Sequence, residues 1–129
     1  MQQIAKNELY ELVYDEGKNR IYWTMKGFWR SMSVVPDFDK DWDKIQSHTK
    51  DNFTILANLV DLKVLPEEVR MANEERQEKL LRSGCKKVAC IILSPITNSS
   101  VQRVTEASGM EEIVKNFNSQ KEAEDWLNE

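Results

Sequence analysis

The stretch KKVACIIL, residues 86–93, constrains the fold of this chain more than any other part of its sequence. Six apolar residues follow its two lysines without interruption, over the length of a typical strand. A strand that is apolar on both faces needs cover on both, as interior strands of parallel sheets have. FTILANLVDL, residues 53–62, is also apolar on both faces. We therefore expect both stretches in the middle of an α/β sheet.

Helical segments alternate with these strands. Phe38, Trp42 and Ile45 follow a helical spacing. The long helix that follows FTILANLVDL opens with a proline and ends with a glycine. Ser99 and Ser100 are expected as cap residues ahead of the next helix. The predicted helices cover residues 36–50, 66–84, 98–109 and 119–128, with a short strand at 112–117 between the last two.

Two further strands are predicted at the start of the chain. LYELVY and RIYWTMKG flank DEGKN, a typical hairpin turn, and Ile21, Trp23 and Met25 alternate with polar residues in the second strand. The expected order is β-β-α-β-α-β-α-β-α, in one domain over residues 1–129. The predicted architecture is a mainly parallel open sheet with an N-terminal β-hairpin and flanking helices.

The charge balance and the hydropathy pattern exclude some classes of protein. A net charge of −4 speaks against a nucleic-acid binder, which needs a basic surface to neutralise phosphates. The longest apolar run, residues 88–93, is far shorter than the roughly 20 residues of a membrane span. MQQIAKNELYELVY lacks the features of a secretory signal, so we expect a cytoplasmic protein.

The residues that usually carry catalysis or bind metals form no recognisable pattern. His48 is the only histidine, and no two of the four glycines lie close enough to form a phosphate-binding loop. DFDKDWDKIQSH fails as a calcium loop, because Trp42 and His48 stand where Gly and Glu are required. Cys85 and Cys90, an odd number of residues apart in a predicted strand, should face opposite sides and share no disulfide or metal. We expect a non-enzymatic protein without a cofactor.

ILANLVDLKVLPEEVRMANEERQEKLLRSGCKKVACIIL, the opening hairpin and the ending EAEDWL together resemble the STAS and SpoIIAA-like superfamily. The likeness is strongest to its stand-alone bacterial members, which are described as STAS/SEC14-like, and it spans residues 8–128. It implies the SpoIIAA-like fold, a small open sheet flanked by helices. It also implies a regulatory module that binds a partner protein or a nucleotide and turns over no substrate.

The loop after the third strand differs from the pattern of this family. In its anti-sigma-factor antagonists, that loop carries an Asp followed by a phosphorylatable Ser. Asp61 matches the Asp, but LKVLPEEV follows it, and no Ser or Thr lies between Asp61 and Ser83. A phosphoswitch of the antagonist type therefore has no acceptor here. Glu67 and Glu68 fall in the first turn of the next helix, where the helix dipole favours carboxylates without any function.

The candidate binding site lies at the loops that leave the predicted parallel strands. Open α/β sheets bind ligands beyond the carboxyl ends of their strands, so residues 27–35, 61–66 and 94–99 should converge. KGFWRSMSVVP has no clear period, and its large apolar residues either cap the core or form a binding surface. The predicted site residues are Phe28, Trp29, Met32, Asp61, Lys63, Val64 and Leu65.

Two functions follow for such a site. The first is a regulatory module that binds a partner protein or a small ligand at this loop edge. The alternative, suggested by the SEC14 side of the resemblance, is a carrier for a lipid-like apolar small molecule, which needs an enclosed cavity of roughly 300 Å³ or more. Association into a homodimer is a further use of an exposed apolar surface.

Overall fold

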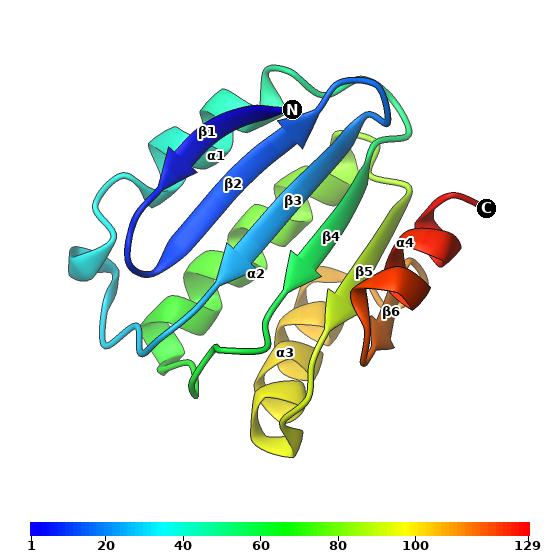
Figure 1. Cartoon of the computed structure of the whole chain (residues 1–129). Helices are drawn as coiled ribbons and strands as arrows, with labels where there is room; N and C mark the ends of the chain where they lie inside the picture. Colours follow the sequence, from blue (N-terminus) through cyan, green and yellow to red (C-terminus); the bar gives the residue numbers. More distant parts are fainter.

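A computed structural model describes residues 1–129 and contains one six-stranded sheet and four α-helices (Figure 1). The strands are β1 (Gln2–Lys6), β2 (Tyr10–Asp15), β3 (Arg20–Met25), β4 (Thr54–Asn58), β5 (Lys87–Ile91) and β6 (Val114–Phe117). The helices are α1 (Phe38–Gln46), α2 (Glu67–Arg82), α3 (Pro95–Ser108) and α4 (Gln120–Leu127), and a short 3-10 turn, η1 (Met32–Val34), precedes α1.

The strands lie side by side in the order in which they occur in the chain. β3, β4, β5 and β6 pair in parallel, whereas β2 is antiparallel to both of its neighbours, β1 and β3. The α/β class and the hairpin of β2 and β3 are thus as predicted. The sheet is mixed, because the hairpin and the strand before it add two antiparallel pairings to the parallel part.

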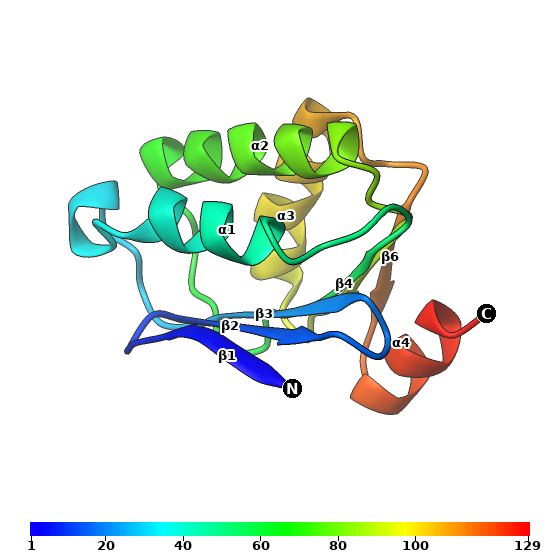
Figure 2. The same cartoon turned by 90° about the horizontal axis from the view of Figure 1, so that it is seen from above.

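The helices form two unequal layers. α1, α2 and α3 cover one face of the sheet, and α4 alone lies on the other (Figure 2). Crossover connections between parallel strands have one handedness, so a chain that adds each strand on the same side keeps its connecting helices on one face. α4 follows the last strand, connects to no further strand and packs on the opposite face. None of the four helices is long and apolar enough to cross a bilayer.

The first strand, β1, was not predicted from the sequence. Only Ile4 of this strand is buried, and its polar neighbours give no alternating pattern. Pairing with β2 places Gln3 opposite Val13 and Lys6 opposite Glu11, with a register shift between Gln3 and Ala5. The strand therefore forms because β2 offers an edge, a long-range contact that local periodicity does not encode.

The main core lies between the sheet and the three-helix layer. Ile21, Trp23 and Met25 of β3 are buried there, as their alternation predicted. Trp23 forms the centre of an aromatic cluster, with ring centroids 4.9 Å from Trp42 and 5.5 Å from Tyr10. The cluster also contains Trp29 and Phe38.

The start of α3 differs from the prediction. The helix begins at Pro95, and Ser94 caps it by accepting a hydrogen bond on Oγ from the Thr97 N–H at 3.4 Å. Ser99 and Ser100 therefore lie inside the helix and are not cap residues. The pair Ser94–Pro95 supplies both a capping side chain and a proline at the first helical position, so it defines the start.

The two cysteines also differ from the prediction. Cys85 precedes β5, so the alternation of a strand does not apply to it, and both Cys85 and Cys90 belong to the main core. Both thiols are free and buried. Burial raises the pKa of each to about 12, which keeps the thiols protonated and unreactive at neutral pH.

Candidate functional site

Three loops meet at the edge where the parallel strands end. The Gly27 N–H donates to the Asp61 carbonyl at 2.9 Å, and the Lys63 N–H donates to the Gly27 carbonyl at 3.0 Å. The buried hydroxyl of Thr97 donates to the Leu62 carbonyl at 2.9 Å. Gly27 has φ 74°, a backbone conformation that favours glycine, so this residue permits the first contact. The connections after β3, β4 and β5 thus lie together, as predicted, and we call them the loop edge.

Two of the predicted site residues belong to the core. Trp29 is fully buried, and its indole N–H donates to the carbonyls of Leu9 and Lys26 at 3.2 and 3.1 Å. Leu65 is also buried and packs in the main core. These two side chains cover the end of the core. For them, the alternative that apolar loop residues cap the core is the correct one, and the prediction of a binding surface is wrong. They pack beneath the exposed residues of the loop edge and are not accessible to a ligand.

The other predicted site residues remain accessible. Phe28 and Val64 expose 58% and 50% of their surface, and Asp61 and Lys63 are also exposed. Met32, in η1, is half-buried against the core. Within one segment, therefore, Phe28 faces outward while its neighbour Trp29 faces inward.

Exposed apolar side chains gather on the loop edge. The chain has six large apolar residues with high exposure, of which three lie in the loops after β3, β4 and β5 and a fourth lies in the first turn of α3. These four are Phe28, Val64, Leu93 and Ile96. Leu93 and Ile96 are not among the predicted site residues, although Ile96 lies within the predicted loop 94–99. Leu93 ends the apolar run 88–93, where burial is the usual expectation. β5 ends at Ile91, and Ser94 and Pro95 begin α3, so this pair marks the turn of the chain between Leu93 and Ile96.

One end of the loop edge carries an open groove of about 660 Å³. The turn between β1 and β2 forms one wall, and the segment from Phe28 to Asp37 forms the other. Phe28 and Arg30 both line it, which places an aromatic ring and a guanidinium group on one accessible surface. Such a combination suits recognition of a protein side chain or a planar group.

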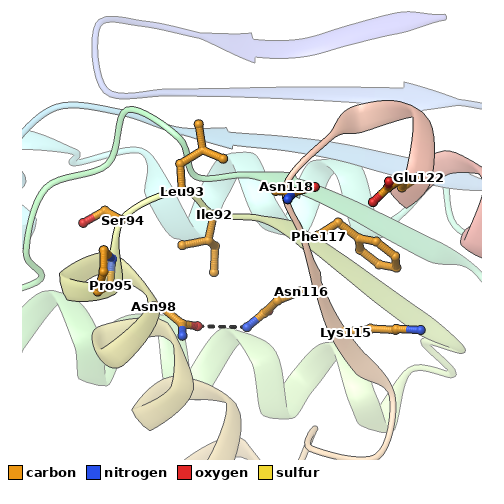
Figure 3. A pocket seen from close by; sticks show the side chains of 10 residues that line it. All are labelled: Ile92, Leu93, Ser94, Pro95, Asn98, Lys115, Asn116, Phe117, Asn118 and Glu122. Carbon is orange, nitrogen blue, oxygen red and sulfur yellow. Dashed lines mark hydrogen bonds between the residues drawn. The ribbon is translucent and has the colours of Figure 1, made fainter.

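The other end carries a second open pocket, also of about 660 Å³, at the ends of β5 and β6 (Figure 3). The chain leaves β5 toward α3 on one face and leaves β6 toward α4 on the opposite face. Adjacent strands whose connections diverge in this way leave a crevice, which is where open α/β sheets bind ligands. The lining residues are Ile92, Leu93, Ser94, Pro95, Asn98, Lys115, Asn116, Phe117, Asn118 and Glu122.

The polar groups of this second pocket are divided by β6. Asn116 donates through Nδ2 to Asn98 Oδ1 at 2.9 Å on the side of α3. Lys115 points to the other side, with its ammonium group 5.5 Å from the centroid of Phe117 and 5.9 Å from that of Trp126. The pocket therefore offers amide groups on one side, and a cation with an aromatic ring on the other.

The interior of the protein holds only a small apolar space. It lies between the sheet and the helices α2 and α3, has a volume of about 50 Å³, and is lined mostly by hydrophobic residues such as Met25, Leu65 and Val104. A lipid-like ligand would need roughly 300 Å³ or more. The packed core thus gives an acyl chain no room in this conformation.

The titratable groups form no arrangement for acid–base or metal chemistry at the loop edge. No three His, Cys, Asp or Glu side chains lie close enough together to hold a metal ion. His48 stacks on Tyr14, with centroids 5.9 Å apart. Burial and a hydrogen bond to the Asp41 carboxylate raise the pKa of Tyr10, so this phenol stays protonated and serves the packing of α1 on the sheet.

Comparison with known proteins shows the fold alone. No protein-family model matches the chain, and no curated protein matches it either. Among solved structures, the chain is similar to the NMR structure of the protein TM1081, with a TM-score of 0.54 and 16% sequence identity. The match covers 96% of this chain and 92% of that protein. At this level of identity the similarity supports the α/β architecture over nearly the whole chain.

Proposed function

We propose that this protein is a non-catalytic regulatory module of the STAS/SpoIIAA-like type that binds a partner protein through its loop edge in the cytoplasm. The observation that carries the proposal is the concentration of exposed Phe28, Val64 and Leu93 on three loops, with Ile96 in the first turn of α3, where hydrogen bonds hold these segments together. Apolar groups exposed on an ordered surface favour protein association, because their burial is gained without first ordering the loops.

The chemistry of the loop edge supports binding over the other uses considered. The interior space of about 50 Å³ disfavours the lipid carrier, and no three His, Cys, Asp or Glu side chains gather to hold a metal ion. Asp61 is exposed, and no hydroxyl residue follows it before Ser83, so the proposed binding is not switched by phosphorylation of this loop. A small ligand, if one takes part, would fit the pocket at the ends of β5 and β6.

A set of surface substitutions tests this function. In the edge variant, Phe28, Val64, Leu93 and Ile96 are each replaced by Ser, and Met71→Ser is the matched control. Met71 is 51% exposed and lies in the second turn of α2, outside the loops of the loop edge. Affinity capture from the host, followed by mass spectrometry, should recover a protein with the wild-type chain and the control that the edge variant fails to recover.

Thermal unfolding must show that all three proteins fold equally well. A partner that binds the edge variant as strongly as the wild-type chain would contradict the assignment of the loop edge. Substrate turnover that survives extensive purification would contradict the non-catalytic part of the proposal.

A further inference from the structure

The strand β6 leaves one side of its backbone without a partner. The Val88 N–H donates to the Ile113 carbonyl at 2.9 Å, and the Ile92 N–H donates to the Phe117 carbonyl at 3.1 Å. Because successive residues of a strand direct their backbone groups to opposite sides, Asn116 directs both its N–H and its C=O away from β5. This outer side of β6 is a free sheet edge.

No other element of the chain covers this edge. α3 packs against α2, and α4 lies on the opposite face of the sheet, where it contacts β4, β5 and β6. Two open hollows flank the strand and share Asn116 in their lining. One is the pocket of about 660 Å³ at the end of β6, and the other is a hollow of about 360 Å³ beside α3 that includes Val101, Thr105 and Val114.

The two edges of the sheet differ in how they are protected. β1 carries a register shift between Gln3 and Ala5, and such a bulge hinders pairing with another strand. β6 pairs with β5 in an unbroken register and contains no proline. Of the two edges, β6 is therefore the one that is suited to accept a further strand.

We propose that β6 pairs with β6 of a second copy of this chain, antiparallel and centred on Asn116. In this register the two Asn116 residues exchange their N–H and C=O groups as a hydrogen-bonded pair. The Asn118 N–H of each copy donates to the Val114 carbonyl of the other. Val114 directs its own N–H to the Met110 carbonyl, at 3.1 Å, so that donor is already satisfied. Each outward-facing backbone group of the strand thus has a partner.

The side chains of β6 are complementary to themselves in the same register. Lys115 of one copy stands opposite Phe117 of the other, an arrangement that allows a cation–π contact. Glu122 lines the pocket beside Phe117, so the incoming Lys115 also approaches an opposite charge. On the other face of the sheet, the amide of Asn116 meets the same amide of the second copy, and amides can both donate and accept.

The symmetry of this dimer has a functional consequence. A two-fold axis perpendicular to the sheet makes the strands of the two copies run in opposite directions. The two loop edges then lie at opposite ends of a continuous sheet, and both stay accessible. The dimer would present two partner sites at once, which raises avidity for a partner that is itself multivalent.

Charge substitutions at the self-opposed position test the proposal. Asn116→Lys and Asn116→Glu each place like charges face to face in a homodimer, so each alone should weaken self-association by about tenfold or more. An equal mixture of the two variants should form a heterodimer. Sedimentation equilibrium up to millimolar concentration should give the mass of two 15.1 kDa chains for the wild type and for the mixture, and a dissociation constant at least about tenfold higher for each variant alone.

Matched substitutions on the opposite edge provide the control. Gln3→Lys and Gln3→Glu change an exposed residue of β1 and should leave the wild-type dimer intact. Asn116→Pro removes the outward N–H, together with the side-chain hydrogen bond to Asn98, and should also weaken the dimer. A monomeric wild type at millimolar concentration overturns the proposal, as does a dissociation constant that stays unchanged in Asn116→Lys or a mixture that stays monomeric.

Discussion

The two faces of the sheet are held by different physical interactions. The face under α1, α2 and α3 belongs to a cluster of 26 buried hydrophobic residues with the aromatic group around Trp23 at its centre. The face under α4 buries a cluster of only 5, and it adds a network of charged and polar groups. The three-helix face is therefore stabilised mainly by packing, to which the buried Arg76 of α2 adds hydrogen bonds to Asp43 and Gln46 of α1 at 3.0 and 2.6 Å. The α4 face has a smaller apolar cluster and depends more on hydrogen bonds between a few specific side chains.

Arg20 is the central residue of that network. It is 2% exposed, and its guanidinium group donates to Glu124 at 2.7 Å, Asn128 at 2.9 Å and Thr54 at 2.9 Å. Glu124 also accepts from the Tyr22 hydroxyl at 2.8 Å. The network joins α4 to β3, so a short helix with few apolar contacts gains a defined position on the sheet.

The two faces should therefore respond differently to pH and to single substitutions. Dispersion and hydrophobic burial depend little on pH or on a single atom, whereas a hydrogen-bonded charge network fails when one partner is lost or protonated. We expect the three-helix face to determine global stability, and the α4 face to open locally under mild conditions. The following predictions test this contrast.

The largest effect is expected at Trp23. Trp23→Ala removes the ring that contacts Trp29, Phe38 and Trp42, and it should reduce the free energy of unfolding by about 3–5 kcal/mol. Trp126→Ala on the α4 face should cost about 1–2 kcal/mol, because that ring is only half-buried. Denaturant titration measures both values. Equal losses would remove the contrast between the faces.

A smaller loss is expected at Arg20. Arg20→Met leaves Thr54 and Asn128 without this donor and removes one of the donors to Glu124, so it should lower the free energy of opening α4 by about 2–3 kcal/mol. Hydrogen exchange should become faster in α4 and stay unchanged in α1 to α3. Lys18→Met is the matched control, because Lys18 contacts the same carboxylate, at 3.3 Å, from an exposed position and should contribute little. Loss of protection throughout the chain would show that the network supports the whole fold.

The pH dependence should arise in part from Glu124. Burial alone would raise the pKa of this carboxyl, but hydrogen bonds from Tyr22 and Arg20 and the charge of Arg20 outweigh it, so the pKa is lowered. A lowered pKa in the folded state stabilises the protein above the unfolded pKa, and this contribution disappears as the pH falls through the folded pKa. Glu124→Gln should therefore cost about 1 kcal/mol at neutral pH, and less in acid.

Chemical denaturation at several acidic and neutral pH values measures this dependence. The stability curves of the wild type and Glu124→Gln should converge as the pH falls below the usual range of glutamate. A constant difference between the two curves would mean that the charge of Glu124 does not contribute to the free energy of unfolding and that only the shape and hydrogen bonds of its side chain do.

The smallest signal is expected from the thiols. Cys85 and Cys90 both lie in the main core, and burial raises the pKa of each to about 12. A thiol reagent at mildly alkaline pH should therefore label neither residue before the three-helix face unfolds. Arg20→Met, which loosens α4, should leave the labelling rate nearly unchanged when it is compared at equal global stability. Rapid labelling of the native wild type would contradict the rigid character assigned to this face.

Part of the candidate site could be predicted from the sequence. The apolar runs extend to Leu62 and Leu93, slightly beyond the ends of β4 at Asn58 and of β5 at Ile91. Parallel strands bring their connections to one edge, so the meeting of these loops was expected. The exposure of individual residues could not be predicted from the sequence. Phe28 and Trp29 are adjacent and both aromatic, but one is 58% exposed and the other is fully buried. Their segment has no period from which burial could be inferred.

The sequence by itself determined the order and type of most elements, because periodicity is a local property. The alternation of Ile21, Trp23 and Met25 and the run VACIIL each indicate a strand without knowledge of the rest of the chain. The tertiary structure alone decided what depends on distant residues. The polar segment Gln2–Lys6 is a strand because it pairs with β2. Gly27 has a positive φ and contacts the loop after β4, and in this arrangement Trp29 lies in the core. Such outcomes rest on contacts between segments far apart in the chain, whose free energy no local pattern records.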